Sequence, residues 1–382
     1  MVKKVIYISS AHLTDKISRE YCIDFLIAKG IAVEYWDLTN LWRGEFNEIG
    51  TKITNYLCTF RTYSEVESRL RLTGNGDALY VVLFTYSGHF VKPFRLLSKY
   101  NCKMLFMAWQ AMPIKSHQKW RGVLAEFFNP LQLAKKIYYK AKIIVYGKLS
   151  LVKQFDIVFA AGQACMRNNW HATKVVPINS IDYDQFIRTE SKEEKVVEGR
   201  YAVFLDAYLP YHPDVKFYGK QAIKPAEYYA SLDRFFQLLE AEYAIKVVIA
   251  AHPRASFSVE PFQGREVYYG QTSELVRDAE FVINHHSTSQ SYAVLSHKPI
   301  IFIYTNEMVS LYENTFVSWA VDFAEYLDAA IYNIDKIIHG AQISIRDVNT
   351  RCYDNYKYSY LTARESEHAT TPDIFFREIS MI

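Results

Sequence analysis

The sequence predicts an α/β protein built from two Rossmann-like domains that face each other across a cleft. In both halves of the chain, short apolar segments rich in β-branched residues alternate with segments of helical periodicity. The chain has 382 residues, of which 50% are hydrophobic, and this is enough for two sizeable cores. Several apolar segments run directly into polar loops, as parallel strands do where their carboxyl ends bind ligands.

Strands and helices alternate through the first half of the chain. We expect strands at 5–8, 32–36, 79–84, 104–107 and 157–160, and helices near 15–29, 90–100 and 162–170. Neither GxGxxG nor GxxxxGK followed by Ser or Thr occurs, so a fingerprinted dinucleotide site and a P-loop are both unsupported. Residues 1–187 are therefore predicted to form the first Rossmann-like domain.

Residues 131–153 within that domain have a basic and apolar pattern. Leucine, isoleucine, valine and tyrosine residues alternate with lysines, and no acidic residue interrupts them. The lysines are Lys135, Lys136, Lys140, Lys142, Lys148 and Lys153. A basic amphipathic segment of this kind can lie on an anionic membrane surface, whereas the alternative is a domain helix with a solvated lysine face.

The second half begins after a charged run. Residues 188–199 are predicted to be an interdomain linker, and residues 200–382 the second domain. We expect strands at 201–206, 246–250, 281–284 and 300–304, and helices at 225–243, 321–338 and 372–379. Two shorter helices complete a β-α-β-α-β run over 245–304, and Thr272 or Ser273 is expected to cap the first of them. The terminal helix is expected to pack back on the first domain.

Composition restricts the class of protein. The formal charge of +3, from 44 basic and 41 acidic residues, gives no argument for nucleic-acid binding. The 5 cysteines have no CxxC spacing, so neither a disulfide framework nor a zinc site is expected. The apolar segment at 2–8 is too short for a signal peptide, and no apolar run could span a bilayer. We expect a cytoplasmic protein that contacts the inner face of the membrane peripherally, if at all.

Three polar motifs follow predicted strands or open a predicted helix in the second domain. They are Asp206, His252-Pro253 and Ser287-Thr288-Ser289. In this order they resemble the acid, His-Pro and serine/threonine motifs of bacterial GT-B glycosyltransferases that use CMP-activated sugars, namely sialyltransferases and Kdo transferases. The string FLDAYLP at 204–210, followed by His212-Pro213-Asp214, looks closest to the retaining β-Kdo transferases of polysaccharide assembly. The similarity covers residues 200–305 in motif detail and the rest in architecture.

The resemblance assigns roles to these residues. A carboxylate such as Asp206 can take a proton from an acceptor hydroxyl or attack the anomeric carbon and form a covalent adduct, and the resemblance implies the second role. His252 is expected to donate to the departing CMP phosphate, and the hydroxyls and helix amides at 287–289 to bind the same phosphate. The alternatives are structural: a turn-capping aspartate, a histidine held by local backbone, and a plain helix cap.

Further candidate residues come from the loops of the second domain and from the first domain. His212 and Asp214 could meet the sugar carboxylate or its hydroxyls, Glu307 could bind a ribose hydroxyl, and Arg254 and His286 flank the donor loops. On the acceptor side the candidates, all at predicted strand ends of the first domain, are His12, His89 and Gln110. The paired histidines 285 and 286 have no nearby acid, and the resemblance implies a helix dipole in place of a cation, so no metal and no cofactor are expected.

Together these features predict a glycosyltransferase. The leading hypothesis is transfer of Kdo from CMP-Kdo to a lipid-linked bacterial surface glycan, with retention and with Asp206 as nucleophile. One alternative is an inverting transferase of a sialic-type, nonulosonic sugar in which Asp206 is the general base. Another is a non-catalytic protein that binds nucleotide sugars, for which the fold alone would suffice.

Overall fold

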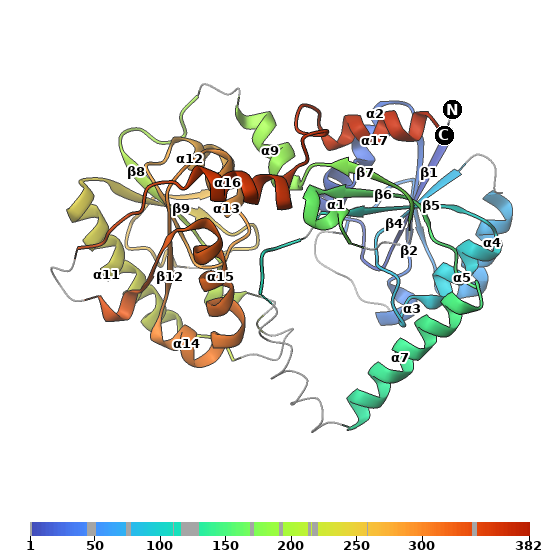
Figure 1. The fold of residues 1–382 in the computed structure, drawn as a ribbon, viewed down its shortest axis with the longest axis horizontal. Coiled ribbons are helices and arrows are strands. Elements are labelled where there is room, and N and C mark those ends of the chain that lie inside the picture. The colour runs from blue at the N-terminus through green and yellow to red at the C-terminus, as the bar shows by residue number, and fades with distance from the viewer. Residues whose placement is uncertain are drawn as a thin grey trace. The chain divides into compact units, whose positions relative to one another are not determined.

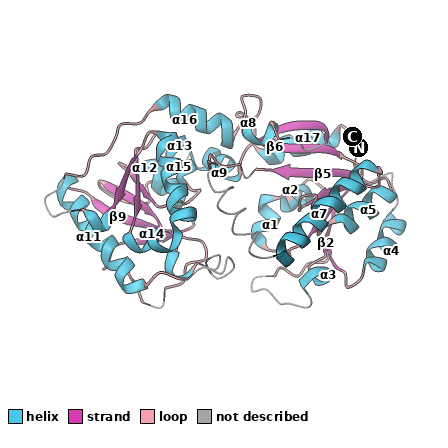
Figure 2. Cartoon of the chain, turned by 60° about the horizontal axis from the view of Figure 1, so that its bottom comes forward, coloured by secondary structure: helices cyan, strands magenta, loops and turns pink. Residues whose placement is uncertain are grey.

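The computed structural model describes residues 2–43, 51–73, 78–109, 111–115, 130–168, 172–190, 194–212, 215, 221–257, 259–337 and 342–382. The chain divides into two compact units. Unit 1 comprises residues 1–110, 119–181 and 362–382, and unit 2 comprises residues 111–118 and 182–361. Each unit is a β-sheet covered by helices (Figures 1 and 2).

The sheet of unit 1 has seven strands in the order β3-β2-β1-β4-β5-β6-β7, and each neighbouring pair is parallel. This doubly wound order is typical of Rossmann-like sheets. The strands are β1 (Lys4–Ser9), β2 (Ala32–Asp37), β3 (Leu57–Thr59), β4 (Ala78–Val82), β5 (Lys103–Ala108), β6 (Phe155–Ala161) and β7 (Ala172–Ile178).

Helices of unit 1 pack on both faces of this sheet. Ile23 and Leu26 from one helix and Phe375 from the last helix share a core with one face, while Phe94 contacts Phe155 on the other. The helices are α1 (Asp15–Glu20), α2 (Ile23–Ala28), α3 (Asn40–Arg43), α4 (Tyr63–Thr73), α5 (Val91–Lys99), α7 (Pro130–Lys148), α8 (Gly162–Met166) and α17 (Thr371–Ser380). The described residues contain no helix long and apolar enough to cross a membrane.

The sheet of unit 2 has six strands in the order β10-β9-β8-β11-β12-β13, again with parallel neighbours. Its residues alternate between two cores, because successive side chains of a strand point to opposite faces. Phe204 and Ile301 lie in one core, and Val203 and Phe302 lie in the other. The strands are β8 (Tyr201–Leu205), β9 (Lys246–Ala251), β10 (Val267–Tyr269), β11 (Val282–Asn284), β12 (Ile300–Tyr304) and β13 (Ala330–Asn333).

Burial of both faces explains why these strands are continuously apolar. The helices that cover them are α9 (Ile181–Glu190), α11 (Pro225–Tyr243), α12 (Thr272–Asp278), α13 (Gln290–Leu295), α14 (Asn306–Tyr312), α15 (Ser318–Leu327) and α16 (Thr350–Tyr356). Short 3-10 turns are η1 (Leu209–Tyr211) and η3 (Ile334–Lys336), and π-helical turns are η2 (Glu313–Val317) and η4 (Lys357–Leu361).

Three local predictions are wrong. The helix expected at 15–29 is two helices, because Cys22 has a left-handed backbone with φ of 61°. The helix expected at 321–338 ends at Leu327, since Asp328 has φ of 54° and the chain continues as β13 beside β12. Neither Thr272 nor Ser273 caps α12, whose cap position is Gln271, and the Ser273 hydroxyl is instead hydrogen-bonded to Thr189 at 2.7 Å.

The chain divides between Ile181 and Asp182, rather than at the expected residue 187. Residues 181–190 form α9, whose Tyr183 is buried in a core of unit 2. The terminal helix α17 belongs to unit 1, where the side chain of Phe375 contacts Phe159 of β6.

Candidate functional site

The candidate site follows the carboxyl ends of four strands of unit 2. Because β8, β9, β11 and β12 are parallel and belong to one sheet, their carboxyl ends lie at one edge. Asp206 follows β8, His252 follows β9, His286 follows β11 and a pocket opens beyond β12. The edge position is the one at which α/β sheets bind ligands.

Asp206 is a buried carboxylate with one oxygen unsatisfied. It is 3% exposed, and its Oδ1 accepts the Tyr208 amide at 2.9 Å. Its Oδ2 is buried and has no hydrogen-bond partner among the described residues. Burial raises the pKa of Asp206 to about 6, although the backbone amides of Tyr208 and His252 act to lower it. The tight turn that makes this bond places Tyr208 in the left-handed region with φ of 50°, which is a strained conformation for a tyrosine.

Three rings lie together beside this carboxylate. The ring centroids of His212 and His252 are 4.9 Å apart, and the Tyr208 ring is nearly parallel to His252 with centroids 6.5 Å apart. Two predicted site residues, His212 and His252, are therefore brought into contact by loops that follow different strands. Tyr208, whose ring is parallel to that of His252, was not predicted as a site residue.

The tautomer of His252 follows from its local contacts. The Arg254 amide donates to His252 Nδ1 at 3.1 Å, so Nδ1 is an acceptor. A neutral imidazole then carries its proton on Nε2, which is a hydrogen-bond donor. This arrangement suits a role in which His252 donates to a phosphate oxygen. Arg254 itself contributes its amide to this turn and has an exposed side chain.

The adjacent histidines have different environments. His285 is fully buried, where Nδ1 donates to the Ile303 carbonyl at 2.7 Å and Nε2 accepts the Tyr228 hydroxyl at 2.8 Å. Burial lowers the pKa of His285 to about 4. Burial, together with the charges of His285 and His212, lowers the pKa of His286 to about 3. His285 is therefore a neutral core residue. His286 could contact a nucleotide-sugar donor only as a neutral imidazole.

The serine/threonine loop is held largely by its own contacts. Ser287 exchanges hydrogen bonds with Asn284, and its hydroxyl accepts the Ser289 amide at 3.3 Å. The amides of Gln290 and Ser291 also bond to loop carbonyls. Ser289 is the cap position of α13 but makes no side-chain cap. A phosphate here would meet hydroxyl groups, above all that of exposed Thr288, rather than unpaired helix amides.

Two more buried polar atoms near the site lack hydrogen-bond partners among the described residues. They are the Tyr229 hydroxyl and His286 Nδ1. Burial raises the pKa of Tyr229, and the nearby charge of Asp206 raises it further. Buried unpaired polar atoms are costly, and several at one strand edge are typical of a site that a ligand completes.

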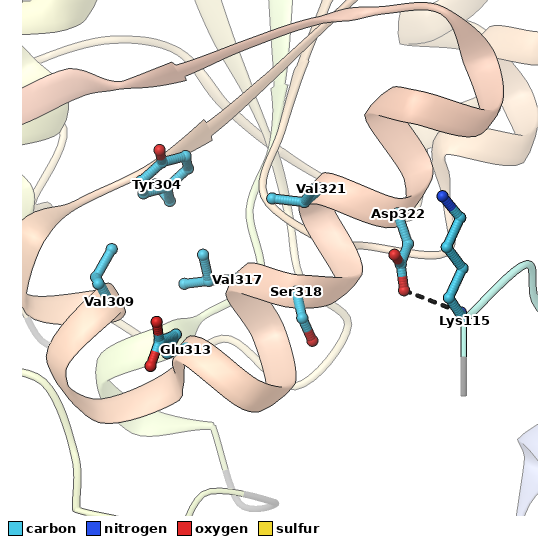
Figure 3. Close-up of a pocket in the computed structure, with 8 residues that line it drawn as sticks. All are labelled: Lys115, Tyr304, Val309, Glu313, Val317, Ser318, Val321 and Asp322. Atoms are coloured by element: carbon cyan, nitrogen blue, oxygen red, sulfur yellow. Dashed lines mark hydrogen bonds between the residues drawn. The ribbon is translucent and has the colours of Figure 1, made fainter. Parts of the chain in front are cut away.

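A pocket of about 360 Å³ adjoins the histidines in unit 2. The His286 ring stacks on Phe316 of η2 with centroids 4.2 Å apart, and the next residue, Val317, lines the pocket. Figure 3 shows the lining residues, which are Lys115, Tyr304, Val309, Glu313, Val317, Ser318, Val321 and Asp322. No sequence pattern indicated this pocket, because η2 and the approach of Lys115 depend on tertiary contacts.

The polar groups that line the pocket are the carboxylates of Glu313 and Asp322, the hydroxyls of Tyr304 and Ser318, and Lys115. The Lys115 amide donates to Asp322 at 3.0 Å, and its ammonium pairs with Glu325 at 2.5 Å. Glu313 is exposed at the rim. Carboxylates and hydroxyls accept hydrogen bonds from the hydroxyls of a ligand, and the two carboxylates would repel a phosphate.

The other predicted residues lie apart from this cluster or outside the described chain. Both carboxylate oxygens of Glu307 accept the Lys224 amide at 3.2 Å, so Glu307 stabilises the start of α11. Asp214 and Gln110 lie outside the described residues. No group of three or more His, Cys, Asp or Glu side chains suited to a metal occurs in the described part of the chain, and the absence of a metal stays an expectation.

The acceptor candidates of unit 1 have specific partners. His12 Nδ1 contacts Asp37 Oδ2 at 2.6 Å, and Asp37 is buried at the end of β2. His89 packs on Tyr139 of α7 with ring centroids 4.1 Å apart. Both histidines follow carboxyl ends of strands, β1 and β4 respectively, as the sequence pattern predicts.

Comparisons with known proteins identify the fold. No protein-family model matches the sequence, and no curated protein matches it. Among solved structures, the wall teichoic acid polymerase TagF has a TM-score of 0.50 and 11% identity, covering 99% of this chain and 90% of that chain. CalG4, the calicheamicin glycosyltransferase, has a TM-score of 0.46 and 11% identity over 88% of this chain and 86% of that chain. The S. aureus MnaA–UDP complex has a TM-score of 0.43 and 11% identity over 99% and 95%. At such identities likeness concerns the fold alone, and with its two parallel sheets the chain has the GT-B fold.

Proposed function

We propose that this protein is a glycosyltransferase that moves Kdo from CMP-Kdo to a lipid-linked glycan at the cytoplasmic face of the membrane, with retention. The observation that carries the proposal is Asp206, a buried carboxylate with an unpaired oxygen beside His212 and His252. The GT-B fold supports the reaction class, and the motif resemblance supports the donor.

In the proposed mechanism, Asp206 attacks the anomeric carbon of the donor. A bond forms between Oδ2 and that carbon, while the bond to the phosphate oxygen breaks and its electron pair leaves with CMP. His252 donates from Nε2 to the phosphate, where negative charge develops. An acceptor hydroxyl then attacks the same carbon and gives its proton to solvent water. The bond from that carbon to Oδ2 breaks, its electron pair returns to the Asp206 carboxylate, and the two inversions give retention.

The pocket beyond β12 supports a nucleotide donor. Its carboxylates and hydroxyls suit the ribose hydroxyls of CMP, and its lining residue Val317 directly follows Phe316, on which His286 stacks. We therefore propose Glu313 and Asp322, rather than Glu307, as the groups that meet ribose. Glu307 already accepts the Lys224 amide.

One observation favours the inverting alternative. A pKa of about 6 for Asp206 is close to the value at which a general base works best near neutral pH. In that mechanism Asp206 takes the proton of the acceptor hydroxyl, which attacks a nonulosonic-sugar donor directly. The two mechanisms differ in the anomer of the product.

Two measurements test the proposed function. Incubation with a panel of CMP-, UDP- and GDP-sugars, with chromatography of the nucleotide released, should show consumption of CMP-Kdo above the others. Calorimetric titration with CMP should show binding. CMP binding with no sugar consumed would favour the non-catalytic alternative, and no binding at about millimolar CMP would refute both enzyme hypotheses.

A further inference from the structure

Helix α7 presents an apolar stripe to solvent. The exposed side chains include Ile137 (60% exposed), Tyr138 (60%), Ile144 (49%) and Val145 (48%). Leu149 (62%) directly follows the helix, and its amide still donates to the Val145 carbonyl. Counted from Ile137, the other four follow after one, seven, eight and twelve residues, and at 3.6 residues per turn this spacing places all five on one face of a helix. Soluble proteins rarely expose a contiguous apolar patch without a partner for it.

The other face of α7 is anchored on unit 1. Tyr139 packs on His89, and a Cβ added at Gly88 would lie 2.4 Å from the Tyr139 Cβ, so the helix and the 87–89 loop are in close contact. Two helical turns further along, the ring of Tyr146 lies 5.1 Å from the Arg95 guanidinium. These two contacts fix the rotation of α7 about its axis, and the side chains of the apolar stripe stay exposed.

Lysines border the stripe. Lys140 lies on one side of it, Lys142 on the other with its ammonium 5.8 Å from the Tyr138 ring centroid, and Lys148 lies at its end. The helix has no acidic residue. Lysine side chains beside an apolar face can extend their ammonium groups to lipid phosphates while the apolar residues enter the acyl region.

We propose that α7 binds an anionic lipid bilayer through the face formed by Ile137, Tyr138, Ile144, Val145 and Leu149. The charge pattern favours this partner over a second copy of the chain, because two copies pairing through this stripe would bring their lysines together. The lipid-linked acceptor in this inference rests on the proposed function. The inference deepens that function because α7 contacts the loop of His89, a candidate acceptor residue. Membrane binding itself is independent of catalysis.

Sedimentation with lipid vesicles tests the proposal on the full chain. The protein should bind vesicles containing about one third phosphatidylglycerol in phosphatidylcholine, and should not bind pure phosphatidylcholine. The Lys140→Gln, Lys142→Gln, Lys148→Gln triple variant should partition about a hundredfold more weakly, since each basic residue near such a surface contributes about fivefold. The Ile144→Ser, Val145→Ser double variant should also lose binding.

Matched controls separate the stripe from general surface effects. The Lys16→Gln, Lys29→Gln, Lys103→Gln triple variant removes the same charge from exposed sites of unit 1, and Leu72→Ser removes an apolar side chain that is 81% exposed on α4. Both controls should bind like the unchanged protein. In a Tyr138→Trp variant, indole fluorescence should shift further to the blue on addition of phosphatidylglycerol vesicles than in the unchanged protein, which has 6 tryptophans. The difference between the two proteins reports insertion at α7.

The proposal is overturned if the unchanged protein does not bind anionic vesicles, or if the control and α7 variants lose binding equally. A second outcome also overturns it: the unchanged protein forms a dimer in sedimentation, does not bind vesicles, and loses the dimer through the Ile144→Ser, Val145→Ser change. A second copy of the chain would then cover the stripe. If the unchanged protein consumes a CMP-sugar in solution but does not bind vesicles, the membrane-binding surface is refuted and the proposed function stands. Binding to vesicles without any sugar consumption would refute the proposed function alone.

Discussion

The Tyr208 amide donates a 2.9 Å hydrogen bond to Asp206 Oδ1, while Asp206 Oδ2 stays buried without a partner among the described residues. The hydrogen bond to Oδ1 fixes the orientation of the carboxylate. Oδ2 is left available for reaction, and burial raises the pKa of the carboxyl group. A buried charge without a partner lowers the stability of the fold. We therefore attribute the buried Asp206 carboxylate to function rather than to folding.

Replacement of Asp206 by asparagine should stabilise the protein above pH 6. The pKa of Asp206 is raised from 3.8 to about 6, so the folded state binds a proton more tightly than the unfolded state does. Stability from this group is present below pH 3.8 and is lost as pH rises through 6. Asp206→Asn should therefore increase the free energy of unfolding by up to about 3 kcal/mol at pH 8.

Urea unfolding at pH 8 and pH 4 checks this prediction. The gain should shrink to near zero at pH 4, where the aspartate is protonated in the folded state. A variant that is equally stabilised at both values, or destabilised at pH 8, would show that Asp206 is not a strained buried carboxylate.

The neutral histidine behind the site should produce the opposite pH dependence. Burial lowers the pKa of His285 to about 4, so the unfolded state binds the proton more tightly below pH 6.5. Stability from this group is complete above pH 6.5 and is lost as pH falls towards 4, by up to about 3 kcal/mol. Comparison of the unchanged protein with His285→Asn by urea unfolding from pH 7 to pH 4.5 measures the difference, and parallel curves for the two proteins would contradict it.

Loss of His252 should slow turnover without weakening the fold. His252→Ala removes a donor to the leaving phosphate, and kcat should fall about a hundredfold or more. His368→Ala, which changes a histidine whose side chain is 90% exposed, is the matched control and should leave kcat unchanged. Thermal unfolding verifies that both variants are folded, and an unchanged kcat in folded His252→Ala would eliminate the proposed role.

Strong periodicity made much of the fold predictable. The strand at 300–304 and the helix at 225–243 match β12 and α11 at both ends, because their apolar patterns are long and bounded by proline or polar residues. β3, β7, α4 and α9 were not predicted. β7 is an edge strand with exposed residues at 173–175, and β3 has only 3 residues, so neither has a clear buried periodicity.

The candidate site was partly predictable for a different reason. The rule that parallel strands place their carboxyl ends at one edge located Asp206 and His252 together. The same rule could not indicate the unpaired Tyr229 hydroxyl, which depends on how α11 packs, or the pocket bordered by η2. It also could not reveal that Glu307 is engaged by α11, because residues 224 and 307 are far apart in sequence.

The covalent role of Asp206 is the central claim, and mass spectrometry of the protein with donor and without acceptor tests it most directly. Double displacement predicts a mass increase of one sugar residue on the peptide that contains Asp206, absent in Asp206→Asn, and NMR should find the donor's anomeric configuration in the product. An inverted product with no adduct on that peptide would contradict the nucleophile role and leave Asp206 as general base.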